Sequence, residues 1–320
     1  MIKTALSLLA CVAAAIAQPV VAQQYPERPV RIVVPFAPGG GSDFTGRLVA
    51  QKLTERLGRS FIVENRPGAG GNLGAETVVK APADGYTLLI ISGSYTVNPS
   101  LYKLTFDPLN DITPIIQVSG GPYVIAVHPS VQANTLAELV ALAKKQPNKL
   151  AYGSSGNGSV MHVSTEYFLD SAKIKLLHIP YKGTGPAMQD TIGGNVQLVF
   201  GAVPTTLPHV KSGRLRALAI TTKKRIVAAP ELPTVAESGY PEYEVTNWHG
   251  LVGPKGLPKD VVNRLNAEIN ELPKSEEMRK QLAADGLEPA GGSPAQFAEI
   301  LKNEMARWNQ VIRQAGIKLE

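Results

Sequence analysis

The stretch VRIVVPFAPGGGSDF, residues 30–44, joins an apolar run to three glycines and then to the start of a helix. The run at 30–34 has the composition of a buried strand. The glycines at 39–41 leave the backbone free to adopt positive φ and let a ligand approach bare amide groups. A strand, a glycine-rich turn and a helix in this order predict one unit of an α/β fold.

The helix after the glycines is marked at both ends. Ser42 is a natural N-cap, and apolar residues recur with a helical period up to Leu57, where Gly58 provides the C-terminal stop. A helix N-terminus offers unpaired N–H groups and the positive end of a dipole. The loop at 36–43 therefore suits an anionic ligand.

Three familiar glycine motifs fail at a residue that their mechanism needs. A dinucleotide-binding fingerprint would place its third glycine at Phe44. A P-loop that begins at Gly41 would need a lysine where the chain has Arg47. A nucleophile elbow, G-x-S-x-G, that begins at Gly153 ends on Asn157. The loops therefore do not match dinucleotide binding, a P-loop or a nucleophile elbow. They remain suited to binding a small anion.

The N-terminus predicts an exported protein. Residues 1–22 combine a positive charge at Lys3, an apolar core and small residues, which indicates a signal peptide cleaved near Ala22, with cleavage after Ala17 as the alternative. Cys11 follows a lipoprotein-like Leu-Leu-Ala, so lipid anchoring there stays open beside a free periplasmic protein. Cleavage near Ala22 would remove the only cysteine and leave no disulfide.

The charge of the chain favours small anionic ligands. The sequence has 32 Lys+Arg against 26 Asp+Glu, a net charge of +6. The basic residues are scattered and are not interleaved with aromatic residues, so no nucleic-acid partner is expected. The five histidines include no pair with the spacing of metal ligands, and no metal or cofactor is expected.

Strand and helix patterns alternate along the rest of the chain. The expected strands are 61–63, 86–91, 123–127, 150–152, 196–200 and 215–221, and the expected helices are 71–80, 135–145, 160–169 and 186–192. This alternation predicts two αβ units with mostly parallel sheets. Ligands bind beyond the carboxyl ends of such strands, so glycine- and serine-rich loops of two facing lobes would close on a small ligand.

Five segments of the chain match one family in order. They are VPFAPGGGSD at 34–43, ENRPGAGG at 64–71, DGYTL at 84–88, YKG at 181–183 and LPTVAESG at 232–239. Together they resemble the Bug family, the extracytoplasmic solute receptors of tripartite tricarboxylate transporters. The similarity extends over essentially the whole mature chain, which makes it far more specific than a single glycine loop.

The resemblance implies a type II periplasmic-binding-protein fold, an α/β architecture of two lobes joined by crossing strands. Each lobe would hold a mostly parallel sheet flanked by helices. Lobe 1 would comprise residues 23–122 and 246–320, and lobe 2 residues 123–245. The resemblance also implies a periplasmic location, a membrane permease as partner and a small carboxylate as ligand: a di- or tricarboxylate, an amino acid or an aromatic acid. A monomer is expected.

In this family, amides of the first loop and of the loop matching 154–159 grip the ligand carboxylate, partly through ordered waters. The ligand-binding residues predicted from the loops and from this resemblance are Phe36, Ala37, Gly39, Gly40, Gly41, Ser42, Asp43, Ser92, Ser94, Asn98, Ser154, Ser155, Gly158, Ser159, His162, Tyr181, Gly183 and Asp190.

Several of these residues have a structural alternative. Asp43 either meets a bridging water or a ligand ammonium group, or it caps its helix. Ser155 and Ser159 either donate to the ligand or cap the helix near residue 160, and a hydroxyl can do both. His162 is either a ligand contact or a buried structural histidine.

The sequence therefore predicts a solute-binding protein that performs no chemistry. A hydrolase or transferase with Ser155 and His162 as a catalytic pair is one alternative, although it lacks an elbow and an orienting acid. The other alternative is a ligand-sensing partner of a membrane signalling protein, which the same fold would serve. A turnover assay distinguishes the enzyme from the solute-binding protein. The identity of the membrane partner distinguishes the sensing role from the transport role.

Overall fold

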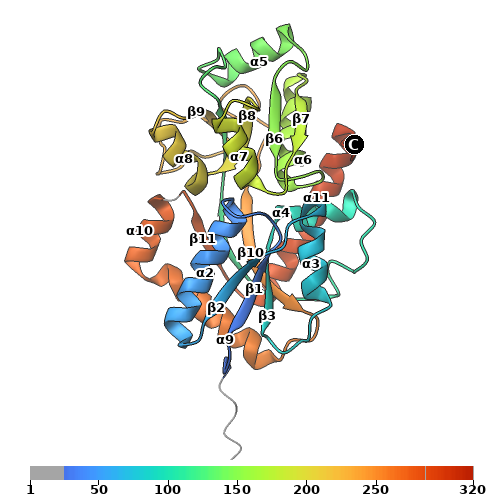
Figure 1. The fold of residues 1–320 in the computed structure, drawn as a ribbon, viewed down its shortest axis with the longest axis vertical. Coiled ribbons are helices and arrows are strands. Elements are labelled where there is room, and N and C mark those ends of the chain that lie inside the picture. Colours follow the sequence, from blue (N-terminus) through green and yellow to red (C-terminus); the bar gives the residue numbers. More distant parts are fainter. Residues whose placement is uncertain (1–24, 285, 320) are drawn as a thin grey trace, which may run out of the picture.

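The structure is a computed structural model that describes residues 25–284 and 286–319. The signal peptide predicted at 1–22 and Cys11 lie outside the described residues. Figure 1 shows two lobes stacked along the long axis, each built around one sheet. None of the helices in the described part of the chain is long and apolar enough to cross a membrane.

Lobe 1, the lower lobe in Figure 1, holds a six-stranded sheet in the order β11-β4-β10-β3-β1-β2. Its strands are β1 (Val30–Val34), β2 (Phe61–Asn65), β3 (Thr87–Ser92), β4 (Ile112–Gly121), β10 (Asn247–Pro254) and β11 (Glu288–Gly291). The α-helices grouped with it are α2 (Gly41–Leu57), α3 (Asn72–Val79), α4 (Gly93–Val97), α9 (Lys259–Asn270), α10 (Glu276–Ala284) and α11 (Pro294–Ala315). Its short 3-10 helices are η1 (Ala69–Gly71), η2 (Asn98–Ser100) and η3 (Leu272–Lys274).

Lobe 2 holds a five-stranded sheet in the order β7-β6-β8-β5-β9. Its strands are β5 (Tyr123–Val127), β6 (Ala151–Ser154), β7 (Leu177–Pro180), β8 (Leu198–Ala202) and β9 (Arg216–Ile220). Its helices are α5 (Leu136–Lys145), α6 (Val160–Ala172), α7 (Thr184–Ile192) and α8 (Val203–Lys211).

The α/β class and the two lobes are confirmed, but both sheets are mixed where the alternation of elements predicts mostly parallel ones. β1 pairs in parallel with β2 and β3, and β6 with β7 and β8. The strands that cross between the lobes pair antiparallel: β10 with β3 and β4, and β5 with β8 and β9. A local strand pattern does not reveal the direction of a strand that enters from the other lobe.

Two crossings of the chain join the lobes, as the resemblance implies. β4 continues through Pro122 into β5, and the chain returns through Val245 into β10. Thr221 ties the two crossings together, because its hydroxyl donates to the Val245 carbonyl (2.8 Å) and accepts from the Tyr123 amide (2.8 Å). Thr221 is fully buried. The two crossings are therefore held together by hydrogen bonds that water does not reach.

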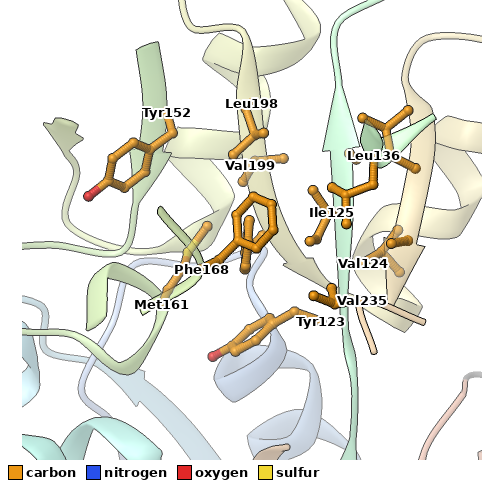
Figure 2. Packing of buried hydrophobic residues seen from close by; sticks show 14 of the residues in the cluster. Tyr123, Val124, Ile125, Leu136, Tyr152, Met161, Phe168, Leu198, Val199 and Val235 are labelled. Atoms are coloured by element: carbon orange, nitrogen blue, oxygen red, sulfur yellow. The ribbon is translucent and has the colours of Figure 1, made fainter. Parts of the chain in front are cut away.

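The core of lobe 2 forms where its sheet meets α6. Figure 2 shows Phe168 of α6 packed against Ile125 of β5 and Val199 of β8, all fully buried. Each strand residue comes from a run with no polar position, which is typical of strands covered on both faces. This packing holds α6 against the sheet of lobe 2.

The last helix, α11, packs against both lobes. Its first half places Phe297 and Leu301 in an apolar cluster of lobe 1. Its second half places Trp308 and Ile312 in the cluster of lobe 2, and Figure 1 shows the helix rising beside both lobes to the C-terminus. A single rigid helix therefore connects the two cores at a position away from the crossing strands.

Candidate functional site

A narrow polar cavity lies between the lobes. Its lining residues come from both lobes and from the crossing strands: Phe36, Gly40, Gly41, Ser42, Asp43, Ser92, Ser94, Tyr123, Ser155, Val160, Thr184, Ala202, Asn247 and His249. The lobes approach closely here and leave little open space between them. The cavity lies beyond the carboxyl ends of β1 and β3, where an α/β sheet places its ligands.

The three loop glycines are needed for two different reasons. Gly39 has a φ of 87° and takes the left-handed conformation that favours glycine. Gly40 and Gly41 lie against lobe 2 instead: a Cβ on Gly40 would lie 3.1 Å from Thr184 Cβ, and one on Gly41 would lie 2.9 Å from Ala202 Cβ. The absence of side chains at these two positions therefore lets the lobes meet.

Ser42 does not cap α2, so this prediction is wrong. The N-cap is Gly40, which has extended backbone angles (φ −101°, ψ 178°) and no capping side chain. Ser42 lies inside the first turn, where it is buried and lines the cavity. The prediction failed because another residue of the same turn, Asp43, holds the loop.

Asp43 organises the glycine loop with its carboxylate. Its Oδ2 accepts from the Gly39 amide (3.1 Å) and from Arg47 Nε (3.0 Å), and its Oδ1 accepts from Asn65 Nδ2 (3.0 Å). Burial by itself would raise the pKa of Asp43, but these hydrogen bonds outweigh it and hold the pKa below its ordinary value. Asp43 does not cap α2, which has no capping side chain, and its carboxylate instead holds the loop that precedes the helix.

Two of the predicted residues, Ala37 and Gly183, lie where the lobes touch. The Ala37 amide donates to the Lys182 carbonyl across the lobe boundary (2.9 Å). Gly183 has a φ of 155°, and a Cβ there would lie 2.8 Å from the Ala37 nitrogen. A second contact joins the lobes where the Tyr102 hydroxyl donates to the Asn157 carbonyl (2.7 Å). The structure thus presents the lobes in a closed arrangement.

The rim at the end of β3 is polar and buried. Ser92 and Ser94 both line the cavity, and Ser94 Oγ accepts from the Val160 amide of lobe 2 (3.0 Å). Asn98 lies deeper in lobe 1, where its amide donates to the Gly70 carbonyl (3.1 Å), and it is not among the residues that line the cavity. Asn98 therefore braces a neighbouring loop.

The serine-rich loop of lobe 2 is divided between cavity and core. Ser155 lines the cavity, whereas Ser154 is fully buried with its Oγ 2.7 Å from His178 Nε2. Ser159 is the N-cap of α6, because its Oγ accepts from the His162 amide (3.2 Å). The capping alternative for Ser159 is therefore confirmed.

His162 is packed inside lobe 2. Its ring stacks on His178 with centroids 4.1 Å apart and planes 9° apart, and its Nδ1 accepts from the Gly158 amide (3.2 Å). Burial lowers the pKa of His162 to about 4, so the ring is neutral at pH 7. Among the described residues no hydrogen bond joins His162 to Ser155, so the geometry does not form the catalytic pair of the hydrolase alternative.

Tyr181 and Asp190 form a pair beside the lobe 2 loop. The Tyr181 hydroxyl donates to Asp190 Oδ2 (2.5 Å). Burial, together with this carboxylate, raises the pKa of Tyr181 to about 12. Neither residue is among those that line the cavity, and their hydrogen bond joins the loop after β7 to α7.

Sequence reasoning missed the residues that the crossing strands bring to the cavity. Asn247 and His249 lie two positions apart on β10 and therefore share one face of the strand. Tyr123 opens β5 on the outgoing crossing. The signal in the sequence was the polar alternation of Asn247 and His249 before an apolar run, but nothing local shows that this strand crosses beneath the loop at 36–43.

Two α/β lobes that close over a buried polar cavity, joined by crossing strands, define the class of two-lobed solute-binding receptors. Residues 45–317 match the family described as "Tripartite tricarboxylate transporter family receptor". The chain belongs to this family, which consists of extracytoplasmic receptors and not of enzymes.

Relatives and solved structures agree with this assignment. The chain is 38% identical over 310 residues to Protein BugT of Bordetella pertussis, covering 96% of this chain and 95% of that protein. It is similar to Rpa4515 of R. palustris with adipate, with a TM-score of 0.89, 37% identity, and coverage of 92% of this chain and 99% of that one. It is also similar to MatC of Rhodopseudomonas palustris with bound malate, with a TM-score of 0.84, 29% identity, and coverage of 90% and 100%.

Proposed function

We propose that this receptor captures a small organic acid in the cavity between its lobes and delivers it to a membrane permease of the tripartite tricarboxylate type. The observation that carries the proposal is the cavity itself, into which the N-terminus of α2 from lobe 1 and the first residue of α6 from lobe 2 both open. Helix N-termini are suited to anions. The similar structures that hold adipate and malate support a dicarboxylate as the ligand class.

The cavity walls suit a carboxylate on a short carbon chain. Gly40, Gly41 and Ser155 would supply amides and a hydroxyl to the carboxylate. Phe36 and Val160 would pack against the carbon chain. Among the described residues that line the cavity there is no lysine or arginine, so the proposed binding rests on neutral hydrogen-bond donors and not on an ion pair.

The proposal assigns the remaining predicted residues to the shape of the cleft. Asp43, Ser94 and Ser159 hold the loops through the hydrogen bonds described above. The lobes would be 23–122 with 246–320, and 123–245, and would hinge where β4 passes into β5 and where the chain enters β10. When the lobes open, Trp308 of α11 must either stay in the core of lobe 2 or leave it.

The proposal places the mature protein in the periplasm as a monomer, with the signal peptide removed near Ala22. N-terminal sequencing of the exported protein and light scattering of the purified protein test these two points. Co-purification from membranes with a permease supports the transport role. Recovery of a signalling protein in place of a permease would overturn that role and support the sensing alternative.

The decisive experiment is a binding screen with a carboxylate library that includes adipate, malate, citrate and glutamate. A ligand at about 100 times its dissociation constant should stabilise the fold by about 2.7 kcal/mol, a clear rise in melting temperature. Adipamide, which lacks the charge of adipate, is the matched control and should produce no shift. A protein that no carboxylate stabilises, or that adipamide stabilises equally, would contradict the proposal.

A further inference from the structure

The one histidine among the described cavity-lining residues, His249, lies on β10, opposite Ser92 of β3. Its side chain is only 1% exposed. Its Nδ1 lies 3.2 Å from the hydroxyl of Thr45, which belongs to the second turn of α2. A hydroxyl can either donate to an imidazole nitrogen or accept from it, so the direction of this hydrogen bond decides which ring nitrogen carries the proton.

The direction of the Thr45 hydrogen bond follows from the geometry of helical threonines. Thr54 and Thr165, which also lie in helices, donate their hydroxyl protons to the carbonyl four residues earlier (2.7 Å and 2.8 Å). Thr45 makes no such bond to the Gly41 carbonyl, and the partner that the structure gives its hydroxyl is His249 Nδ1. Because a buried hydroxyl donates its proton wherever an acceptor is in reach, Thr45 is the donor and Nδ1 the acceptor.

The ring of His249 then carries its proton on Nε2. Burial lowers the pKa of His249 to about 4, so the ring stays neutral at pH 7 and keeps this single N–H. Two other titratable side chains among the described residues line the cavity. Burial raises the pKa of Tyr123, so its hydroxyl keeps its proton at pH 7. Asp43 already accepts from Gly39, Arg47 and Asn65. Both oxygens of the Asp43 carboxylate therefore already have donors within the protein, and none of these donors is His249.

We propose that Thr45 fixes His249 as the Nε2–H tautomer so that this N–H donates to a carboxylate of the bound organic acid. This inference rests on the proposed function and adds a specificity element to it. A fixed N–H selects an acceptor such as a carboxylate oxygen and disfavours an ammonium group at the same place. Because the ring is neutral, it binds the anion less tightly than a charged partner would. The ligand can therefore leave the site faster than it would leave an ion pair.

Two substitutions of His249 separate its two nitrogens. His249→Asn keeps an oxygen where Nδ1 lies, so Thr45 retains an acceptor, but it removes the donor at Nε2. His249→Gln places an amide N–H near the position of Nε2 and loses the contact to Thr45. With adipate as the probe in titration calorimetry, we expect the Asn variant to bind about ten- to a hundredfold more weakly than wild type, and the Gln variant to keep most of the affinity.

The tautomer itself is measured by nitrogen NMR of the full chain labelled with ¹⁵N-histidine, without ligand. We expect His249 to show a protonated Nε2 and an unprotonated Nδ1. Thr45→Val, which replaces the hydroxyl by a methyl group, should produce a mixture of the two tautomers and a weaker affinity for adipate. Thr45→Ser, the conservative control, should restore both the single tautomer and the affinity.

Each outcome bears on the inference separately from the proposed function. Wild-type affinity in a folded His249→Asn variant would overturn the contact while leaving the receptor function intact. A protonated Nδ1 in the wild-type protein would overturn the role of Thr45. A wild-type protein that binds none of the carboxylates in the screen would overturn the proposed function and the ligand contact together, although the tautomer would still be measurable.

Discussion

A single methyl group at the lobe boundary should separate ligand binding from folding. Gly41→Ala would add a Cβ 2.9 Å from Ala202 Cβ on lobe 2 and 3.3 Å from His249 Cε1. The distance of 2.9 Å is shorter than Cβ atoms tolerate, and the closest partner is a short side chain that has no freedom to rotate away. The overlap arises where the two lobes meet, so separation of the lobes relieves most of it.

The magnitude follows from the cost of overpacking, about 1–3 kcal/mol for an added methyl group. This strain penalises the closed arrangement, so it should appear as a loss of affinity for adipate of about five- to 150-fold. The melting temperature of the unliganded protein should change little, because a small separation of the lobes at Gly41 relieves the overlap while Trp308 stays in the core of lobe 2.

Titration calorimetry with adipate and thermal denaturation of the same samples test this prediction. Gly193→Ala is the matched control, because Gly193 is exposed, has a φ of −76°, and its Cβ would lie an ordinary 3.5 Å from the Gln189 carbonyl. Unchanged affinity in Gly41→Ala would refute the reasoning, because the closed contact between the lobes would then play no part in the bound state.

Three further predictions concern lobe 2 and its contact with lobe 1. Ser159→Ala should lower the free energy of unfolding by about 1 kcal/mol in urea denaturation, because α6 loses its N-cap. Tyr102→Phe should weaken adipate binding about two- to tenfold in calorimetry, because the hydrogen bond to the Asn157 carbonyl is lost. Stability measured in urea should fall as the pH drops from about 6.5, because burial lowers the pKa of His162 to about 4 and that of His178 to about 3.

The sign of the pH effect comes from the unfolded chain, in which both histidines titrate near 6.5. Between pH 6.5 and about 4 the unfolded state binds protons that the folded state does not bind. The free energy of unfolding therefore falls by up to about 1.4 kcal/mol per pH unit for each of the two groups. His162→Gln should make this slope shallower, and an equal slope in that variant would contradict a buried neutral ring. Unchanged stability in Ser159→Ala, or unchanged affinity in Tyr102→Phe, would likewise contradict the roles given to these contacts.

Much of the fold could be predicted from short-range patterns. The run at 30–34 forms β1, and the helix after the glycines ends at Gly58, which has the expected left-handed φ of 68°. Ser159 caps α6. Each of these features depends on residues within a few positions along the chain, so the local sequence contains the information. The order of the family motifs then supplied the two-lobed architecture.

The sequence by itself thus determined the positions of β1, β2, β3, β5, β6, β8 and β9, the C-terminal end of α2, the family and the two loops that border the cleft. The tertiary structure alone decided that His249 reaches the cavity from a strand 204 positions beyond Thr45, and that Gly41 must lack a side chain because Ala202 lies against it. It also decided that the Asp43 carboxylate accepts a hydrogen bond from the Gly39 amide of its own loop. Strand direction, burial and the meeting of two lobes arise from contacts between residues far apart in the chain, and such contacts leave no periodic trace in a local pattern.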